Sequence, residues 1–290
     1  MQRRKIWAGL SSAVLVATPA ASQVTAMPAQ PRASVEAKAD QGLLQLAQHK
    51  GHDAGAIKAA PPAASGDGEG GEGGGATNLS PQLHLYRGLE LIRGHLLVGG
   101  ELVETGRWAE ALPHFLHPEE EIYNSLREDL KTFKIAPFQV ALKALSQTVK
   151  AKNKEAYARA RAAIDERLAA AETAVREKET DKLHFTLETA LEVLQQASDE
   201  YGEAFKNGRI ANVVEYQDAR GFVQEADRLI GTMGDALSAK NADAAKALRA
   251  SLDDLKSTFP TVTPPEKAAK DHGQFLSSVA RFELQLGNFR

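Results

Sequence analysis

From Ser80 to the C-terminus, apolar residues recur every three or four positions, which is the period of an amphipathic α-helix. The first predicted helix begins at Pro81, because Ser80 is a good N-cap and proline suits the first helical position. Its apolar side forms one stripe of Leu85, Leu89, Ile92, Leu96 and Val103, and an adjacent stripe of His84, Leu91, His95, Val98 and Leu102. Two neighbouring stripes indicate a helix that packs on more than one side.

The same period continues along the rest of the chain, interrupted by short turns. A helix break is expected at Pro118, since proline cannot continue a helix that contains His114. A glycine C-cap is expected at Asn207-Gly208. Because short turns place long amphipathic helices antiparallel, the sequence predicts an all-α fold, either an antiparallel helical bundle or a helical-hairpin array. The further predicted helices cover residues 107–116, 118–133, 137–152, 153–178, 181–206, 211–239, 241–259 and 264–288.

The first 26 residues carry the pattern of a secretory signal peptide. Arg3, Arg4 and Lys5 form a positive flank, residues 6–17 form a short apolar core, and small residues follow up to Ala26. The apolar core falls short of the roughly 20 residues that a membrane span needs. We therefore expect cleavage and a periplasmic mature protein without a membrane span.

Residues 27–78 differ in composition from the helical part of the chain. Residues 61–75 are dominated by glycine with scattered acids, and such a segment buries too little apolar surface to offset the entropy of ordering. The sequence therefore predicts three parts: a signal peptide over 1–26, a disordered Gly/Ala/acidic linker over 27–78 and a helical bundle domain over 79–290.

The composition excludes several classes of function. The chain holds no cysteine, which removes disulfides, thiolate metal sites and cysteine nucleophiles. Its net charge is −3, and no basic block would attract nucleic acid. The motifs of serine hydrolases, phosphate-binding loops, dinucleotide-binding folds and His-Glu-x-x-His metallopeptidases are also absent from the sequence. We expect a protein that is not an enzyme and does not bind nucleic acid.

Two groups of side chains could bind a ligand. In the first group, two histidines precede three glutamates at residues 119–121. Imidazoles beside carboxylates suit a transition-metal ion such as iron, copper or zinc. A second interpretation stays open, in which the glutamates only complement the positive end of the next helix. The candidate metal ligands in this group are His114, His117, Glu120 and Glu121.

The second group is the pair His84 and His95 on the first predicted helix. They lie three turns apart on nearly the same face, within an otherwise apolar stripe. About 16 Å separates them at a rise of 1.5 Å per residue, so they cannot share one small ion and each needs ligands from another helix. Further contributors could come from the acids near the core stripe of the predicted helix 211–239, which are Glu215, Asp218 and Glu225.

A resemblance to a known family lies in residues 201–222. There Tyr201 precedes a turn at residues 206–210 (Lys-Asn-Gly-Arg-Ile), and a helix with Glu215 and Tyr216 follows. This arrangement resembles the exported helical region that precedes the membrane part of bacterial high-affinity iron permeases. The sequence lacks permease helices and the membrane Arg-Glu-x-x-Glu motif, so we do not expect it to be the transporter itself.

A fainter likeness, based on His117-x-x-Glu120 and the all-helical pattern, is to imelysin-like periplasmic proteins. Either resemblance implies a periplasmic accessory that binds or presents a metal, with a membrane-bound metal-uptake component as its partner.

The principal hypothesis is a periplasmic, non-enzymatic helical protein that binds a metal ion or assists iron uptake. The alternative is a structural or protein-interaction module without a metal, in which the linker is a tether and the helix faces dock a partner. A metallopeptidase-like enzyme is a third alternative, for which the sequence offers no base to activate water. Convergence of the candidate side chains on one point would indicate a metal site, whereas outward splay would indicate helix capping.

Overall fold

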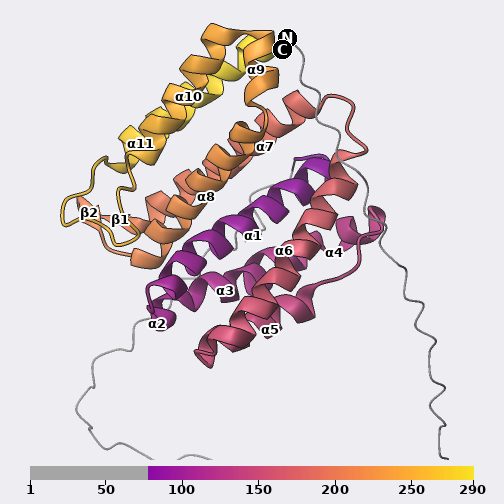
Figure 1. The fold of residues 1–290 in the computed structure, drawn as a ribbon. Helices are drawn as coiled ribbons and strands as arrows, with labels where there is room; N and C mark the ends of the chain where they lie inside the picture. Colours follow the sequence, from indigo (N-terminus) through magenta and orange to yellow (C-terminus); the bar gives the residue numbers. More distant parts are fainter. Residues whose placement is uncertain (1–77) are drawn as a thin grey trace, which may run out of the picture. The chain divides into compact units, whose positions relative to one another are not determined.

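The computed structural model describes residues 78–290 (Figure 1). The predicted signal peptide (1–26) and all but the last residue of the predicted linker (27–78) lie outside the described residues, so these assignments stay predictions. The described part is helical almost throughout, which confirms the predicted all-α fold. No helix among these residues combines the length and the apolar character that a membrane crossing requires.

The longer helices are α1 (Pro81–Glu104), α4 (Tyr123–Thr132), α5 (Gln139–Lys150), α6 (Lys154–Arg176), α7 (Lys182–Ala204), α8 (Val213–Thr232), α10 (Ala242–Lys256) and α11 (His272–Leu286). The shorter elements are α2 (Trp108–Ala111), α3 (Pro113–His117), the π-helical turn η1 (Pro118–Ile122), strands β1 (Phe205–Lys206) and β2 (Arg209–Ile210), α9 (Gly234–Lys240) and the 3-10 turn η2 (Gly287–Phe289).

Helix α1 lies at the centre of the helical packing (Figure 1). It packs against α7 and α8 on one side and against α3, α4 and α6 on the other. Both predicted apolar stripes are buried as a result: Leu85 and Leu89 of the first stripe and Leu91 and Val98 of the second are all inaccessible to solvent. A helix covered on opposite sides explains why its sequence carries two stripes.

Helices α1 and α8 cross at two glycines. A Cβ atom added to Gly221 would lie 2.4 Å from the carbonyl oxygen of Gly94, and one added to Gly94 would lie 2.5 Å from the Phe222 ring. The two backbones therefore touch, and a larger residue at either position would push the helices apart. Side chains next to this crossing are brought unusually close to one another.

The predicted helix break at Pro118 is wrong. The backbone keeps right-handed helical dihedral angles at His117 (φ −49°, ψ −44°) and at Pro118 (φ −54°, ψ −35°), and it continues through η1 into α4. In η1 the amide of Tyr123 donates to the carbonyl of Pro118, one residue farther back than in an α-helix. Pro118 has no N–H to donate to the preceding turn, and the helical path widens directly after it.

The predicted glycine C-cap at Asn207-Gly208 is also wrong. These two residues have φ values of +53° and +78° and connect β1 to β2 as a two-residue hairpin, in which Phe205 pairs with Ile210. Asn-Gly is the preferred sequence for a type I′ hairpin turn, because both central residues need a positive φ. The α7–α8 connection is therefore a short antiparallel ribbon.

Two of the predicted helices are shorter in the structure. The predicted helix 211–239 divides at Met233 into α8 and α9. The predicted helix 264–288 begins only after Asp271, which forms a capping box with Gln274. Reciprocal hydrogen bonds of this kind fix a helix start more firmly than a proline does.

Candidate metal centre

Asp218 lies at the centre of a cluster of three histidines. Its Oδ1 atom is 2.7 Å from Nδ1 of His95 and 2.6 Å from Nδ1 of His114. Its Oδ2 atom is 3.2 Å from Nδ1 of His117. Ligand atoms of His95, His114 and Asp218 all lie within 4.8 Å of one another. Three imidazoles and one carboxylate thus converge on one point.

Three helices bring these side chains together. His95 on α1 and Asp218 on α8 both lie within one turn of the glycine crossing, so their side chains meet directly. His114 and His117 are three residues apart in the short helix α3, and this spacing puts both imidazoles on one side of the helical path. Helix α3 packs against α1 and α8, which directs that side toward Asp218.

The centre is shielded from water. The side chains of His95, His114 and Asp218 are completely buried, whereas that of His117 is 12% exposed. The ring of Phe222 packs edge-on against His95 with a centroid distance of 5.0 Å. Charges interact strongly in such surroundings. Among the four residues, His117 is the one through which an ion can approach.

The charges within the cluster shift the pKa values of Asp218 and His117. Burial alone would raise the pKa of the Asp218 carboxyl, but the attraction of His95 and His114 and hydrogen bonds from the histidines hold this pKa well below its usual range. Burial would lower the pKa of His117, but the hydrogen bond and the charge of Asp218 outweigh it and raise that pKa above its ordinary value. Asp218 is therefore ionised at physiological pH, as a metal ligand must be.

Gln217 fixes the orientation of the His114 ring. Its Nε2 atom donates to the carbonyl of Val262 at 3.1 Å, which leaves its Oε1 atom to accept from Nε2 of His114 at 2.9 Å. Nδ1 of His114 is thereby directed at the Asp218 carboxylate. Histidine ligands in metal sites commonly donate their second N–H to such a carbonyl oxygen.

Two buried atoms of the cluster have, in the described part of the chain, only a long and poorly aligned contact with each other. They are Nδ1 of His117 and Oδ2 of Asp218, which lie 3.2 Å apart. Buried polar atoms left in this state cost free energy, and an ion bound between them would satisfy both. Imidazole nitrogen and carboxylate oxygen are ligands that iron, zinc and copper accept in proteins. The residues therefore fit a transition-metal ion.

Part of the chain, including Asp218, matches a known protein family. Residues 176–288 match the iron permease-associated 4-helix bundle domain. No curated protein and no solved structure matches the chain. The matched segment contains the four long helices α7, α8, α10 and α11 and the short helix α9. The match confirms the resemblance to the exported helical region of iron permeases. It links the chain to iron uptake.

The histidine–aspartate cluster lies only partly within the segment that matches the iron permease-associated bundle. Asp218 lies within the matched residues 176–288, whereas the three histidines lie before them on α1 and α3. The centre therefore forms where the bundle meets the helices that precede it in the chain.

The predicted ligands divide between this cluster and other places. Three of the six belong to the cluster: His95, His114 and His117. Glu121 lies at its rim, with Oε1 3.9 Å from Nε2 of His117. Glu120 is exposed, so the His117-x-x-Glu120 spacing does not bring these two side chains to one site. His84 lies elsewhere on α1 and contacts Asp129 at 2.6 Å.

The sequence pattern did not single out Asp218 among the acids of its helix. It flanks the apolar stripe of the predicted helix 211–239, where an acid usually faces solvent or a salt bridge. In the structure Tyr216, Gln217, Asp218 and Ala219 are all buried, because α1 and α7 cover α8 on different sides. The available signal was the glycine at residue 221, one turn away, which marks a close helix approach.

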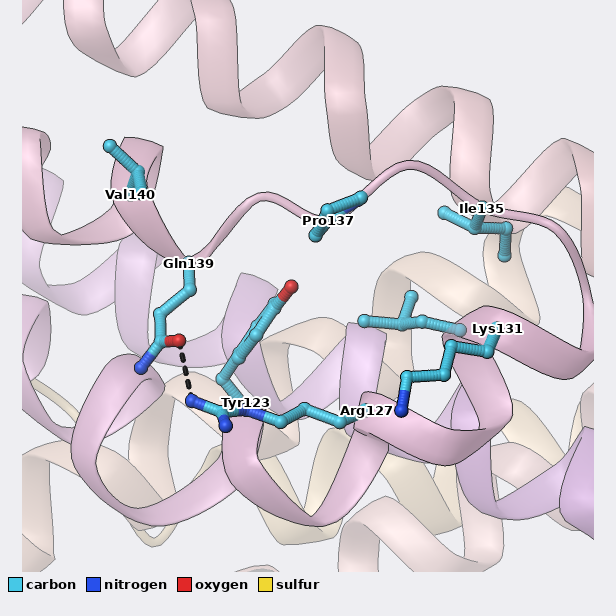
Figure 2. A pocket seen from close by; sticks show the side chains of 8 residues that line it. Tyr123, Arg127, Lys131, Ile135, Pro137, Gln139 and Val140 are labelled. Atoms are coloured by element: carbon cyan, nitrogen blue, oxygen red, sulfur yellow. Dashed lines mark hydrogen bonds between the residues drawn. The ribbon is translucent and has the colours of Figure 1, made fainter.

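A surface pocket of about 400 Å³ lies between α4 and the start of α5 (Figure 2). Nη2 of Arg127 donates to Oε1 of Gln139 beside it at 2.6 Å. Its lining includes no histidine and no acid, the side chains that form the candidate metal centre. The lining residues are Tyr123, Arg127, Leu130, Lys131, Ile135, Pro137, Gln139 and Val140.

Proposed function

We propose that this protein binds a transition-metal ion between its three clustered histidines and Asp218, and that it serves iron uptake as a non-enzymatic accessory. The convergence of His95, His114 and His117 on one buried carboxylate carries the proposal. The match to the iron permease-associated bundle supports iron as the metal, and mixed imidazole and carboxylate ligands suit ferrous iron. The ion is cargo here, not the cofactor of a reaction.

The cluster can exchange protons for the ion. Histidines bind metals in their neutral form, so binding releases the protons that the metal-free imidazoles hold. The raised pKa of His117 adds to this competition, and metal affinity should therefore increase as pH rises. Asp218 offsets part of the charge of the ion, and the partly exposed His117 offers a route for capture and release.

The location and the partner of the protein form part of the same proposal. The predicted signal peptide supports a periplasmic location, and the family match supports a membrane-bound metal-uptake component as the partner. The absence of catalytic motifs from the sequence supports a role in binding and delivery.

Metal analysis of the full chain tests the site. The protein is exposed to Fe(II) without oxygen, and separately to Zn(II) and Cu(II), then desalted and analysed for retained metal. We expect the wild type to hold one ion at the histidine cluster, and Asp218→Asn and His114→Ala to retain one ion fewer per chain, since each change removes a ligand. The matched control is His184→Ala on α7, because His184 is 40% exposed and contacts Glu188 at 2.8 Å.

Each contrary result has a defined meaning. A folded wild-type protein that retains no metal would contradict the proposal and favour the interaction module, with the cluster only stabilising helix packing. Equal loss of metal in His184→Ala would show that the ion is not held by the buried cluster. Peptide hydrolysis by the metal-loaded protein would favour the metallopeptidase-like alternative.

A further inference from the structure

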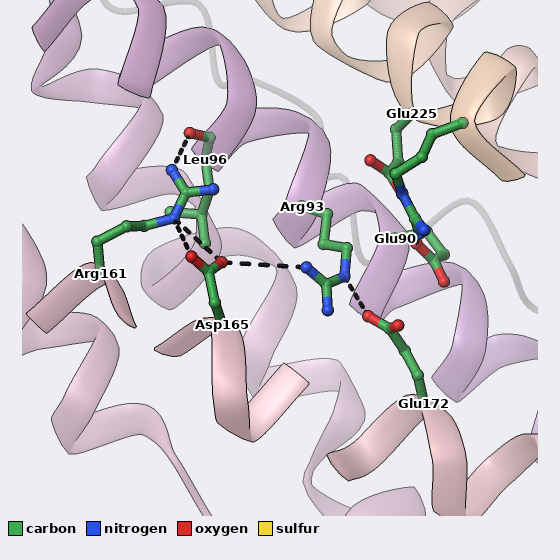
Figure 3. A network of polar contacts seen from close by, with 8 residues as sticks. Glu90, Arg93, Leu96, Arg161, Asp165, Glu172 and Glu225 are labelled. Carbon is green, nitrogen blue, oxygen red and sulfur yellow. Dashed lines mark hydrogen bonds and ion pairs between the residues drawn. The ribbon is translucent and has the colours of Figure 1, made fainter. Parts of the chain in front are cut away.

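A second cluster of charged side chains lies on the same α1–α8 interface as the metal centre (Figure 3). Glu90 precedes His95 by five residues on α1, and Glu225 follows Asp218 by seven residues on α8. Since the two helices run in opposite directions, both carboxylates lie beyond the histidines toward the same end of the interface. Their side chains are 0% and 2% exposed.

A guanidinium joins these two carboxylates. Nη2 of Arg228 is 2.9 Å from Oε2 of Glu90 and 2.6 Å from Oε1 of Glu225. Beside this group Arg93 donates to Glu172 of α6, so a second guanidinium pairs with a third carboxylate. The Arg228 cation therefore already occupies the position between two inward-facing carboxylates that a metal ion would take.

The cluster carries more negative than positive groups. With Asp165 and Arg161, which continue the network beyond Arg93, four carboxylates face three guanidiniums. One negative charge is left over unless a proton is bound. Burial first, and then the charges of Glu225 and Glu172, raise the pKa of Glu90 well above its ordinary value. Burial raises the pKa of Glu172 as well, and the larger shift makes Glu90 the first acceptor of that proton. Its second oxygen, Oε1, is buried without a hydrogen-bond partner among residues 78–290. Tyr86 on the same side of α1 interacts with the Glu90 carboxyl, and burial and the charges of Glu90 and Glu172 raise the pKa of its hydroxyl, whereas the charge of Arg176 lowers it.

The Arg228 side chain is far more exposed to solvent than the two carboxylates that it joins. The side chain of Arg228 is 42% exposed, whereas both carboxylates are shielded. A long arginine side chain that already reaches solvent can rotate outward at little cost, because its charge is then hydrated. The carboxylates have no such freedom and would remain directed at the vacated position.

We propose that Glu90 and Glu225 form a second cation site, which takes a divalent metal ion in exchange for the guanidinium of Arg228 and one proton. Before exchange, neutral Glu90, ionised Glu225 and Arg228 sum to zero charge. After exchange, two ionised carboxylates and the divalent ion again sum to zero, with the proton released to water and Arg228 turned to solvent. No net charge is buried by the exchange, which removes the main energetic obstacle to it.

The ligand chemistry distinguishes this site from the histidine centre. Its donors are carboxylate oxygens, which suit manganese, magnesium and ferrous iron better than copper or zinc. It shares no residue with the histidine centre and does not depend on metal binding there. Mn²⁺ is a suitable probe, because the EPR signal of the free aqueous ion disappears when the ion is bound.

Titration of the full chain with Mn²⁺ at mildly alkaline pH tests the site, with free Mn²⁺ measured by EPR and protons by pH-stat. We expect the wild type to release one proton for each ion bound at this site and Glu90→Gln to lose one bound equivalent. Arg228→Gln should bind Mn²⁺ about tenfold more tightly, which corresponds to about 1.4 kcal/mol for an ion pair that no longer has to be broken. Circular dichroism checks that each variant is folded.

Two controls separate the possible outcomes. Arg249→Gln removes a comparable surface cation, which is 40% exposed and pairs with Asp227 at 2.5 Å, and should leave Mn²⁺ binding unchanged. His114→Ala should retain the Mn²⁺ that Glu90→Gln loses, whatever becomes of the histidine centre. Equal Mn²⁺ binding by folded wild type and Glu90→Gln, or binding without proton release, would overturn the proposal and leave the cluster as a structural ion-pair network.

Discussion

Two buried carboxyl groups on the α1–α8 interface, Asp218 and Glu90, have pKa values shifted in opposite directions because their neighbours differ. Asp218 faces imidazoles that attract its negative charge, and its pKa lies well below the usual range. Glu90 faces the carboxylates of Glu225 and Glu172 in a buried place, and its pKa is raised. Neighbouring charge therefore decides which of two buried acids is ionised. The contribution of Asp218 to stability is therefore lost as pH falls, whereas that of Glu90 is lost as pH rises.

We expect Glu90→Gln to resemble wild type in stability at acidic pH and to exceed it at alkaline pH. The folded-state pKa of Glu90 is raised above its ordinary value of 4.5, so its stabilising contribution is complete below that value and is lost as pH rises through the folded pKa. Glutamine does not ionise and escapes this loss. Urea denaturation of both proteins across a pH series, without added metal, measures the difference. A gap that stays constant with pH would contradict the assignment of the proton to Glu90.

Helix packing sets the distances within the centre. The contact of Gly94 with Gly221 lets α1 and α8 approach until their backbones touch, and His95 meets Asp218 because of it. The π turn η1 has a comparable role for α3, since it carries the helical path past Pro118 without a break and keeps His114 and His117 in place. These local features position the ligands more than the fold class does.

We expect Gly221→Ala to lower the free energy of unfolding by about 1–3 kcal/mol, because its Cβ would overlap the backbone of α1. Metal binding should weaken as well, since the helices must separate between His95 and Asp218. Gly231→Ala on the same helix is the matched control. A Cβ there meets nothing within 4 Å, so this change should be neutral or stabilise α8 by up to about 1 kcal/mol. Chemical denaturation and metal titration of the two variants provide the comparison, and equal effects would contradict a specific role for the crossing.

Periodicity in the sequence predicted the all-α class and most of the helices, because amphipathic spacing reports burial directly. It failed where backbone geometry overrides side-chain type, at Pro118 and at Asn207-Gly208. Three of the centre's four residues were predicted as metal ligands, since histidines in apolar surroundings are conspicuous. Asp218 was named only as one of three possible further contributors, because the pairing of helices that buries it depends on contacts more than one hundred residues apart.

The molecule as a whole joins the iron permease-associated bundle to the helices that precede it. The bundle supplies Asp218, and α1 and α3 supply the imidazoles. A protein that consisted of residues 176–288 alone would keep the carboxylate and lose every histidine of the centre. It would also expose the face of α8 that α1 covers.

We expect residues 78–290, expressed alone, to retain the same number of metal ions per chain as the full protein, because this segment contains all four ligands. Residues 176–290 should retain none, since a single carboxylate does not hold a transition-metal ion through desalting. Metal analysis of both fragments beside the full chain, with circular dichroism to verify helicity, makes the comparison. Retention by the shorter fragment would place the site outside the histidine cluster.

The separation of the ligands along the chain has a consequence for the lifetime of the protein. Asp218 is 123 residues from His95 and 104 from His114, so an ion held between them closes very large loops, as a reversible cross-link would. A metal ion whose free concentration is 100 times its dissociation constant adds about 2.7 kcal/mol to the free energy of unfolding. Loaded molecules would therefore open less often and resist proteolysis, while empty ones would be degraded. Under the proposed function, the abundance of the protein would then follow the supply of the metal.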